Sequence, residues 1–275
     1  MEITEPNTVI IKGGLGNQLF QIFALISYCI DNDYNYVFPY NMEKWDKRIS
    51  NWDSLLSELK KNTCSNALLR NIPIYQENNF VYNKIPIFNN NIRLNGYFQS
   101  EMYFKDNYNH IVDLLKIREK QYELKDKINR VNSISLHFRM GDFGNIHHPI
   151  LPDSYYINAL KYIIHYTNKS DWNIYYACEK NDELIVNKRV NNIKNQFNNL
   201  NFIIIDHNNK DWEQLLIMSL CEHNIIANST FSWWAAYFNN NPENIVCYPS
   251  LWFGPAKNMD LKDLFPDRWK KIDIN

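Results

Sequence analysis

The stretch Ser133-Ile134-Ser135-Leu136-His137-Phe138-Arg139-Met140-Gly141-Asp142 runs from an apolar alternation into a polar turn. The alternation is typical of a buried β-strand, predicted over 133–138, and places Arg139 at its carboxyl end. In open α/β sheets ligands bind beyond these ends, and a planar guanidinium with five donors suits a phosphate. The stretch therefore predicts an anion site at Arg139. A surface turn held by an ion pair between Arg139 and Asp142 is the alternative.

From residue 133 onward, segments with strand periodicity alternate with segments of helical periodicity. The predicted strands are 133–138, 172–178, 202–206, 225–228 and 245–249, and the predicted helices are 153–167, 182–194, 211–223 and 232–239. This order favours an α/β architecture, a doubly wound parallel sheet with helices on both faces. A ligand is expected at the carboxyl ends of the strands, where Arg139 falls.

The N-terminal part of the chain contains one clear strand-loop-helix unit. A β-rich run over 8–12 precedes the glycine loop Gly13-Gly14-Leu15-Gly16-Asn17-Gln18, and a helical pattern follows over 19–30. Glycines at a helix start let a ligand approach backbone N–H groups that favour negative charge. The spacing matches neither the dinucleotide-binding fingerprint nor the Walker loop, so an ordinary glycine turn is the alternative. Farther along, the sequence predicts mostly loops over 34–95, a strand that leads into a ligand-facing loop over 94–100, and a helix over 105–130.

Composition limits the classes of protein to which this chain can belong. With 275 residues, 45% of them hydrophobic, it can build one large domain or two smaller ones. A net charge of -1 without a block of Lys or Arg argues against nucleic-acid binding. Five scattered cysteines without a CxxC pair indicate free thiols in a reducing compartment.

The longest apolar run near the start of the chain, 22–30, is too short to span a bilayer, and no basic segment precedes it. We therefore expect no integral membrane segment. The expected location is the cytoplasm, of a bacterium or of a virus-infected cell, with at most a loose membrane association.

A third motif runs from Ile225 to Tyr237, where an apolar strand pattern enters a turn rich in hydroxyl groups. Ser229, Thr230 and Ser232 stand where a helix begins, and such residues most often cap helices. The same position offers hydroxyls and backbone N–H groups to a phosphate. Helix capping and phosphate binding are compatible at this position, so the turn is a second candidate anion site.

These motifs together carry a family resemblance. The glycine loop with its continuation to Gln21, the segment 137–142 and the segment 225–237 resemble the soluble bacterial and viral α-1,2-fucosyltransferases of glycosyltransferase family 11. Segments 148–156 and 206–224 fit the same family. The resemblance covers nearly the whole chain, with the motifs in the same order.

The resemblance implies a GT-B-like fold, in which two Rossmann-like halves face a cleft. Residues 1–128 would form the acceptor-side half, and residues 129–275 the half that binds GDP-fucose. It also implies an inverting transfer of L-fucose to the 2-hydroxyl of a galactose-like sugar. No metal is expected to be obligatory, and no cofactor besides the donor substrate. The expected partners are GDP-fucose and a glycan acceptor, while the oligomeric state does not follow from the sequence.

The resemblance further assigns roles to individual residues. Arg139 would bind the diphosphate, because an enzyme without a metal must stabilise the negative charge that develops on the leaving group with preorganised hydrogen-bond donors. His137 would face guanine, and Asp142 would brace the arginine loop. The other donor- or acceptor-binding candidates are Gly14, Gly16, Asn17 and Gln18 in the glycine loop, and Asn228, Ser229, Thr230, Phe231 and Ser232 in the hydroxyl-rich turn.

An inverting transfer also benefits from a base that takes the proton of the acceptor hydroxyl. His148, or its neighbour His147, lies in the loop that follows the arginine, and a histidine is the side chain that commonly takes up a proton at neutral pH. A histidine that only hydrogen-bonds backbone is the alternative, and Asp142 and Glu179 are competing bases.

Two positions depart from the family pattern. Met140 stands where relatives often carry a second arginine. The segment Ala177-Cys178-Glu179-Lys180-Asn181-Asp182 stands where they commonly carry Ser-Asp-Asp after a strand. Glu179 remains a candidate acceptor for guanine. The departures leave two alternatives open: a transferase that uses another deoxyhexose nucleotide, and a catalytically silent module that binds a sugar nucleotide or a glycan.

Overall fold

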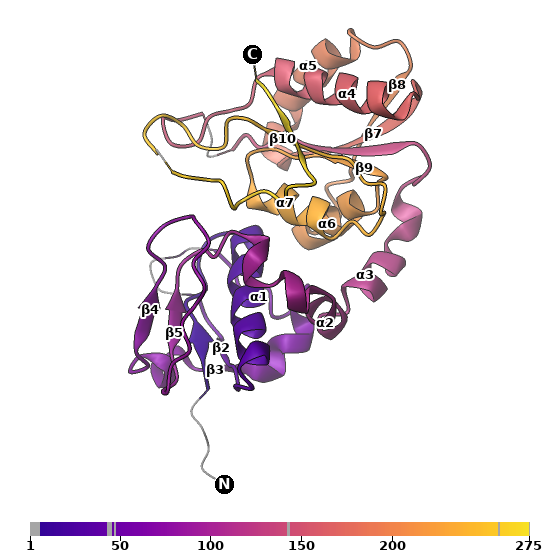
Figure 1. Cartoon of the computed structure of the whole chain (residues 1–275). Helices are drawn as coiled ribbons and strands as arrows, with labels where there is room; N and C mark the ends of the chain where they lie inside the picture. Colours follow the sequence, from indigo (N-terminus) through magenta and orange to yellow (C-terminus); the bar gives the residue numbers. More distant parts are fainter. Residues whose placement is uncertain (1–5, 43–45, 47, 142–143, 258, 275) are drawn as a thin grey trace. The chain divides into compact units, whose positions relative to one another are not determined.

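The computed structural model describes residues 6–42, 46, 48–141, 144–257 and 259–274 (Figure 1). Contacts divide the chain into two compact units. The N-terminal unit comprises residues 1–119 and 259–266, and the C-terminal unit comprises residues 120–258 and 267–275. The division of the chain into 1–128 and 129–275 stays a prediction, but these contacts place a late segment, 259–266, in the N-terminal unit.

The C-terminal unit is built on six parallel strands in the order β11-β10-β9-β6-β7-β8. Their bounds are Ser133–His137 for β6, Trp172–Ala177 for β7, Leu200–Ile204 for β8, His223–Ile225 for β9, Val246–Pro249 for β10 and Lys270–Ile272 for β11. Helices α4 (Asp153–Thr167) and α5 (Glu183–Lys194) cover one face, and α6 (Asp211–Ser219) and α7 (Thr230–Tyr237) cover the other (Figure 1). The predicted α/β class with a doubly wound parallel sheet is confirmed.

The alternation in β6 explains how this strand serves both faces of the sheet. Ile134 and Leu136 are fully buried in the core formed with α4 and α5. Ser135, which points to the opposite face, accepts a 2.6 Å hydrogen bond from Asn224 Nδ2. Because a buried amide and a buried hydroxyl satisfy each other there, the polar residues of the strand cost little stability.

The order of the strands creates a topological switch point beside β6. The chain adds β7 and then β8 on one side of β6, and it crosses back to place β9 on the other side. The connections that leave β6 and β9 therefore turn to opposite faces of the sheet. In this architecture, ligands bind at the carboxyl ends of the strands beside such a switch point.

The N-terminal unit has a smaller parallel sheet in the order β1-β5-β4, formed by Thr8–Val9, Arg93–Asn95 and Ile74–Gln76. A second parallel pair joins β2 (Phe38–Pro39) to β3 (Thr63–Cys64). The helices are α1 (Leu15–Asp31), α2 (Tyr108–Leu114) and α3 (Ile117–Glu123), the last of which spans the division between the units. Short 3₁₀ turns are η1 Ser57–Asn62, η2 Asn66–Leu69, η3 Glu101–Tyr103, η4 Lys105–Asn107, η5 Lys125–Lys127 and, in the C-terminal unit, η6 Lys180–Asp182.

Several predicted elements have different bounds. Helix α1 begins at Leu15, inside the glycine motif rather than after it, because Gly14 is extended and serves as its N-cap. The single helix predicted over 105–130 is wrong, since Lys116 adopts a left-handed φ of 53° and separates α2 from α3. The strand predicted over 225–228 lies at His223–Ile225 instead. Among the described helices, none is long and apolar enough to cross a membrane.

Candidate active site

Arg139 lies at the switch point, two residues beyond the end of β6. The backbone N–H of Phe138 donates to Ala177 O at 2.9 Å and extends the pairing with β7. Phe138 is buried, with its ring 4.6 Å from that of Tyr156 on α4. Since side chains alternate along a strand, His137 and Arg139 point to the face opposite Phe138. The His137 ring accordingly lies 5.3 Å from the ring of Phe231 on α7.

Arg139 forms an ion pair with Glu179, which follows β7. The same two loops meet again where Gly141 N donates to Asp182 Oδ2 at 2.8 Å. Gly141 has a φ of +48°, and a Cβ there would stand 3.0 Å from Glu179 Oε2. Glu179 is therefore one partner of Arg139 in this arrangement. Asp142, which was predicted to brace this loop, lies outside the described residues.

Met140, the departure from the family pattern, faces the core. It is 8% exposed, and its sulfur lies 3.4 Å from Arg189 Nη1. Arg189 extends from α5 and pairs with Asp153 Oδ1 at 2.6 Å. A buried methionine at this position thus packs beneath the arginine loop and adds no positive charge beside Arg139.

The turn between β9 and α7 is held by its own side chains. Ser229 caps α7 by accepting from Phe231 N at 3.3 Å. Ser232 Oγ accepts from Ala227 N at 3.1 Å and donates to Ser229 O at 3.2 Å. Thr230 and Phe231 are half-buried in the first turn of the helix. The structure therefore assigns capping and turn-closing roles to the two serines, and both roles fix the helix N-terminus.

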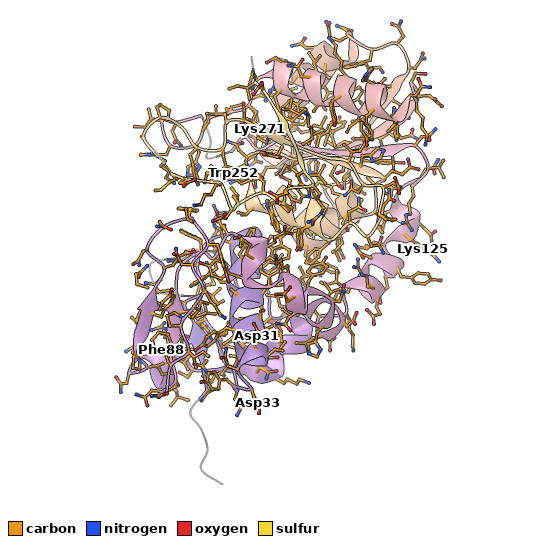
Figure 2. The ribbon with its side chains drawn as sticks, in the orientation of Figure 1. Asp31, Asp33, Phe88, Lys125, Trp252 and Lys271 are labelled. Carbon is orange, nitrogen blue, oxygen red and sulfur yellow. The ribbon has the colours of Figure 1, made fainter. Side chains whose placement is uncertain are left out.

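Asn228 connects this turn to two loops of the same unit. Its Nδ2 donates to Pro149 O at 2.9 Å and to Trp252 O at 3.2 Å, and Trp252 is labelled in Figure 2. The carbonyl groups belong to the segment that follows the arginine loop and to the segment that follows β10. One buried amide therefore fixes both loops relative to the carboxyl end of β9.

Two buried polar atoms at the switch point have no hydrogen-bond partner among the described residues. They are His137 Nδ1 and Asn228 Oδ1. Burial, reinforced by the charge of Arg139, lowers the pKa of His137 to about 3, so its imidazole is neutral at physiological pH. An unsatisfied buried polar group costs about 1–3 kcal/mol, and a ligand that bonds these atoms would recover that energy.

His148 lies in a loop packed on the segment 253–257. Gly144 N donates to His148 O at 2.8 Å, and Gly254 N donates to His147 O at 2.9 Å. Lys257 Nζ stands 3.1 Å from His148 Nε2 and 4.8 Å from the centre of the Phe253 ring. An ammonium only donates, so Nε2 accepts this bond and the proton of a neutral ring lies on Nδ1. His147 is exposed.

The glycine-loop candidates come together in the N-terminal unit, but with different surroundings. Gln18 is 1% exposed, and its Nε2 donates to Gly13 O at 3.0 Å and to Ile49 O at 2.9 Å. Its Oε1 accepts from Asn51, so Gln18 holds the loop rather than facing a ligand. Gly16 is buried in α1, whereas Asn17 is half-buried and Gly14 has no atom within 4 Å of a hypothetical Cβ.

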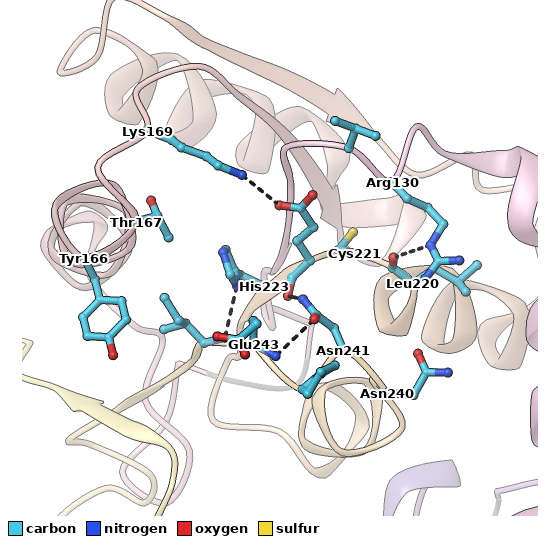
Figure 3. Close-up of a pocket in the computed structure, with 14 residues that line it drawn as sticks. Arg130, Tyr166, Thr167, Lys169, Leu220, Cys221, His223, Asn240, Asn241 and Glu243 are labelled. Atoms are coloured by element: carbon cyan, nitrogen blue, oxygen red, sulfur yellow. Dashed lines mark hydrogen bonds and ion pairs between the residues drawn. The ribbon is translucent and has the colours of Figure 1, made fainter.

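A separate hollow opens at the amino ends of β6, β9 and β10 (Figure 3). Glu222 pairs there with Lys169 at 3.8 Å, and His223 Nδ1 accepts from Ile245 N at 3.1 Å. None of the candidate residues lines it. Because doubly wound sheets bind ligands at the carboxyl ends of their strands, this hollow is not the candidate site.

The profile described as "Glycosyl transferase family 11" matches residues 2–272 of the chain. The chain belongs to glycosyl transferase family 11. An alpha-1,2-colitosyltransferase of Escherichia coli is 30% identical over 186 residues, which are 65% of this chain and 61% of that relative. The O-antigen biosynthesis glycosyltransferase WbnK of Escherichia coli is 27% identical over an alignment of 298 residues, covering 88% of this chain and 93% of WbnK.

A solved structure of a glycosyl transferase family 9 protein from Veillonella parvula DSM 2008 matches with a TM-score of 0.48 and 11% identity, covering 99% of this chain and 88% of that one. Membership of family 11 makes the chain a glycosyltransferase, with a nucleotide sugar as donor and a glycan as acceptor.

Proposed function

We propose that this member of glycosyl transferase family 11 moves L-fucose from GDP-fucose to the 2-hydroxyl of a galactose-like sugar with inversion. The observation that carries the proposal is the position of Arg139 at the switch point between β6 and β9, beside the neutral, buried His137. A nucleoside diphosphate suits this position, because Arg139 provides charge and His137 provides an unsatisfied ring nitrogen.

The reaction depends on stabilising the negative charge of the leaving group and requires no covalent enzyme intermediate. The acceptor oxygen attacks the anomeric carbon while the opposite bond to the phosphate oxygen breaks, and the bonding electrons stay on the leaving GDP. Arg139 and the N-terminus of α7 stabilise the resulting negative charge. Ser229 and Ser232 hold this N-terminus in place through their hydrogen bonds. Under this proposal no metal is obligatory, since the guanidinium takes its place.

Recognition of guanine falls to the residues around Arg139. His137 Nδ1 and Asn228 Oδ1 offer unsatisfied atoms to the nucleoside. Glu179, which pairs with Arg139 when no diphosphate is bound, accepts from guanine once the diphosphate has displaced it from the guanidinium. Asp142 braces the same loop in this proposal. These assignments rest on the family resemblance and on the position of the residues at the carboxyl ends of β6, β7 and β9.

His148 is the proposed base for the proton of the acceptor hydroxyl. Lys257 donates to its Nε2, so the ring accepts a proton there only after this contact is released. A substrate that draws the ammonium toward its own phosphate or hydroxyl groups would release it.

A second candidate is transfer of colitose, another deoxyhexose, because one relative at 30% identity is an alpha-1,2-colitosyltransferase. The two candidates differ in the sugar that is transferred. A module that binds a sugar nucleotide without turnover is the candidate from another class.

The test combines nucleotide binding with transfer. Melting temperatures with GDP, UDP and dTDP identify the nucleotide, because the true product stabilises the fold most strongly. GDP-fucose and GDP-colitose are then offered with a β-galactoside, and the linkage of the product is assigned by NMR. We expect the largest shift with GDP and an α-1,2-linked fucosyl product. A larger shift with UDP or dTDP, or binding without turnover, would overturn the proposal.

A further inference from the structure

Gln99 of the N-terminal unit carries an unsatisfied, buried oxygen. Its side-chain Nε2 donates to Asn17 Oδ1 in the first turn of α1 at 2.9 Å. Within the described part of the chain, its Oε1 has no hydrogen-bond partner, although the residue is only 6% exposed. Because Oε1 and Nε2 share one carbon, this oxygen lies beside Asn17 and the glycine loop.

The turn that precedes Gln99 is held in an uncommon conformation. Phe98 is fully buried and has a φ of +51°, a left-handed conformation that bulky residues rarely adopt. The carboxylate of Glu77 holds the turn by accepting from Tyr97 N at 2.6 Å and from Phe98 N at 3.0 Å. A Cβ on Gly96 would stand 2.4 Å from Glu77 Cβ, so the close approach requires glycine. Such over-determined strain accumulates at functional sites.

The turn stands at the carboxyl ends of the parallel strands β1, β5 and β4. Lys12, which follows β1, donates from Nζ to Asn95 Oδ1 at 2.9 Å and lies 4.8 Å from the centre of the Tyr97 ring. Gln21 fixes the backbone of Lys12 by bonding both its N–H and its C=O. An ammonium, planar amides and a half-buried aromatic ring thus gather at one edge, and hydroxyl-rich sugars are bound by such side chains.

We propose that Gln99 is a specificity-determining residue that binds one hydroxyl of the acceptor sugar, with Oε1 as the hydrogen-bond acceptor. The inference rests on the proposed transfer to a glycan and names a contact on the acceptor side. A sugar hydroxyl donates to the unsatisfied oxygen, whereas a sugar without that hydroxyl leaves it buried and unpaired. Gln99 therefore discriminates among acceptors, and Glu77 acts through the turn as a positioning residue.

The experiment compares Gln99→Met with the wild-type protein and with the control Gln196→Met, which changes an exposed glutamine. The acceptors are methyl β-D-galactoside and analogues in which each hydroxyl other than the reactive one is removed in turn. The readouts are kcat and KM for the acceptor, the hydrolysis of GDP-fucose without acceptor, and the melting-temperature shift with GDP.

We expect Gln99→Met to raise KM for the methyl galactoside by about 10- to 100-fold, the range that corresponds to a lost bond to a buried acceptor. Hydrolysis and the GDP shift should stay at wild-type values, as they should in Gln196→Met. With the wild-type protein, the KM of one deoxy analogue should exceed that of methyl β-D-galactoside by a similar factor. Gln99→Met should not raise the KM of that analogue further. Should Gln99→Met fail to fold, Gln99→Asn, which withdraws the oxygen by one methylene, carries the same prediction.

An unchanged KM in the variant, or equal losses for every deoxy analogue in both proteins, would overturn the proposal and leave Gln99 with a bound water only. Failure of the proposed function is seen separately, as absence of transfer from GDP-fucose by the wild-type protein. In that case, saturation-transfer NMR with methyl β-D-galactoside still decides: the galactoside signal should be present with the wild-type protein and weakened in Gln99→Met, and equal signals would overturn the proposal.

Discussion

The guanidinium of Arg139 and the carboxylate of Glu179 form an ion pair that joins the loop after β6 to the loop after β7. The two side chains are 18% and 52% exposed. Half-exposed pairs of this kind contribute little free energy, about 0–1 kcal/mol. A diphosphate carries more charge than a single carboxylate, so it can displace Glu179 from the guanidinium.

The ion pair predicts that Glu179→Gln tightens the binding of inorganic pyrophosphate by roughly 3- to 10-fold, since the competing charge is removed while an amide oxygen remains for Arg139. Isothermal titration calorimetry measures the change. Glu183→Gln is the matched control, because Glu183 lies on α5 and pairs with His207 instead. Weaker binding by Glu179→Gln would mean that the carboxylate orients Arg139 rather than competes for it.

Two residues of the glycine loop distinguish a glycine that leaves room for a ligand from a glycine that the backbone conformation requires. Gly14 has a φ of -70°, caps α1 without a side-chain bond and has open space at its Cβ position. Gly14→Ser should therefore keep or slightly raise the melting temperature, because serine is a good N-cap. We expect it to lower transfer at least 10-fold, on the order of the effect of a blocked close contact.

Gly13→Ala is the comparison for this variant. Gly13 has a φ of +79°, and its Cβ would stand 2.5 Å from Asn17 Nδ2, so this substitution should lower the melting temperature as well as the activity. Full transfer by Gly14→Ser would show that no ligand approaches the loop at this residue.

Two buried histidines of the C-terminal unit predict how stability depends on pH. Burial lowers the pKa of His137 to about 3 and that of His223 to about 4, whereas both would titrate near 6.5 in the unfolded chain. The unfolded state thus binds more protons below pH 6.5, so stability is complete above this pH and falls as pH decreases toward 4. The slope is about 1.4 kcal/mol per pH unit for each histidine.

Urea unfolding between about pH 7 and about pH 5 measures this slope. His137→Gln should reduce it, because one depressed pKa is lost, and the exposed His110→Gln should leave it unchanged. An identical slope in His137→Gln and the wild-type protein would show that His137 does not titrate as described.

The sheet of the C-terminal unit follows from local sequence patterns. Alternation over 133–138 and the regular spacing of strands and helices specify strand after strand, because each element buries its own apolar side chains. The same patterns place Arg139 at a carboxyl end. They do not specify strand order, so the switch point beside β6 becomes visible only in the sheet.

The partners within the site depend on contacts between distant residues. Lys257 is 109 positions from His148, and no local pattern links them. Gln18 has the residue type of a ligand-binding amide, but three hydrogen bonds within the N-terminal unit use its side chain. The segment of Gln99 was predicted to lead into a ligand-facing loop, but the residue itself was not a candidate, because its signal is an unsatisfied atom rather than a motif.

The most direct test of the central claim is the rate of GDP release from GDP-fucose in the presence of a β-galactoside, compared between the wild-type protein and Arg139→Ala. Loss of a preorganised charge at the leaving group predicts a decrease in kcat of about 1,000-fold or more, with an unchanged melting temperature. Arg70→Ala, which removes an exposed arginine of the N-terminal unit, should retain full activity. A folded Arg139→Ala protein that releases GDP within about 3-fold of the wild-type rate would contradict the account, because that difference corresponds to less than 1 kcal/mol of transition-state stabilisation.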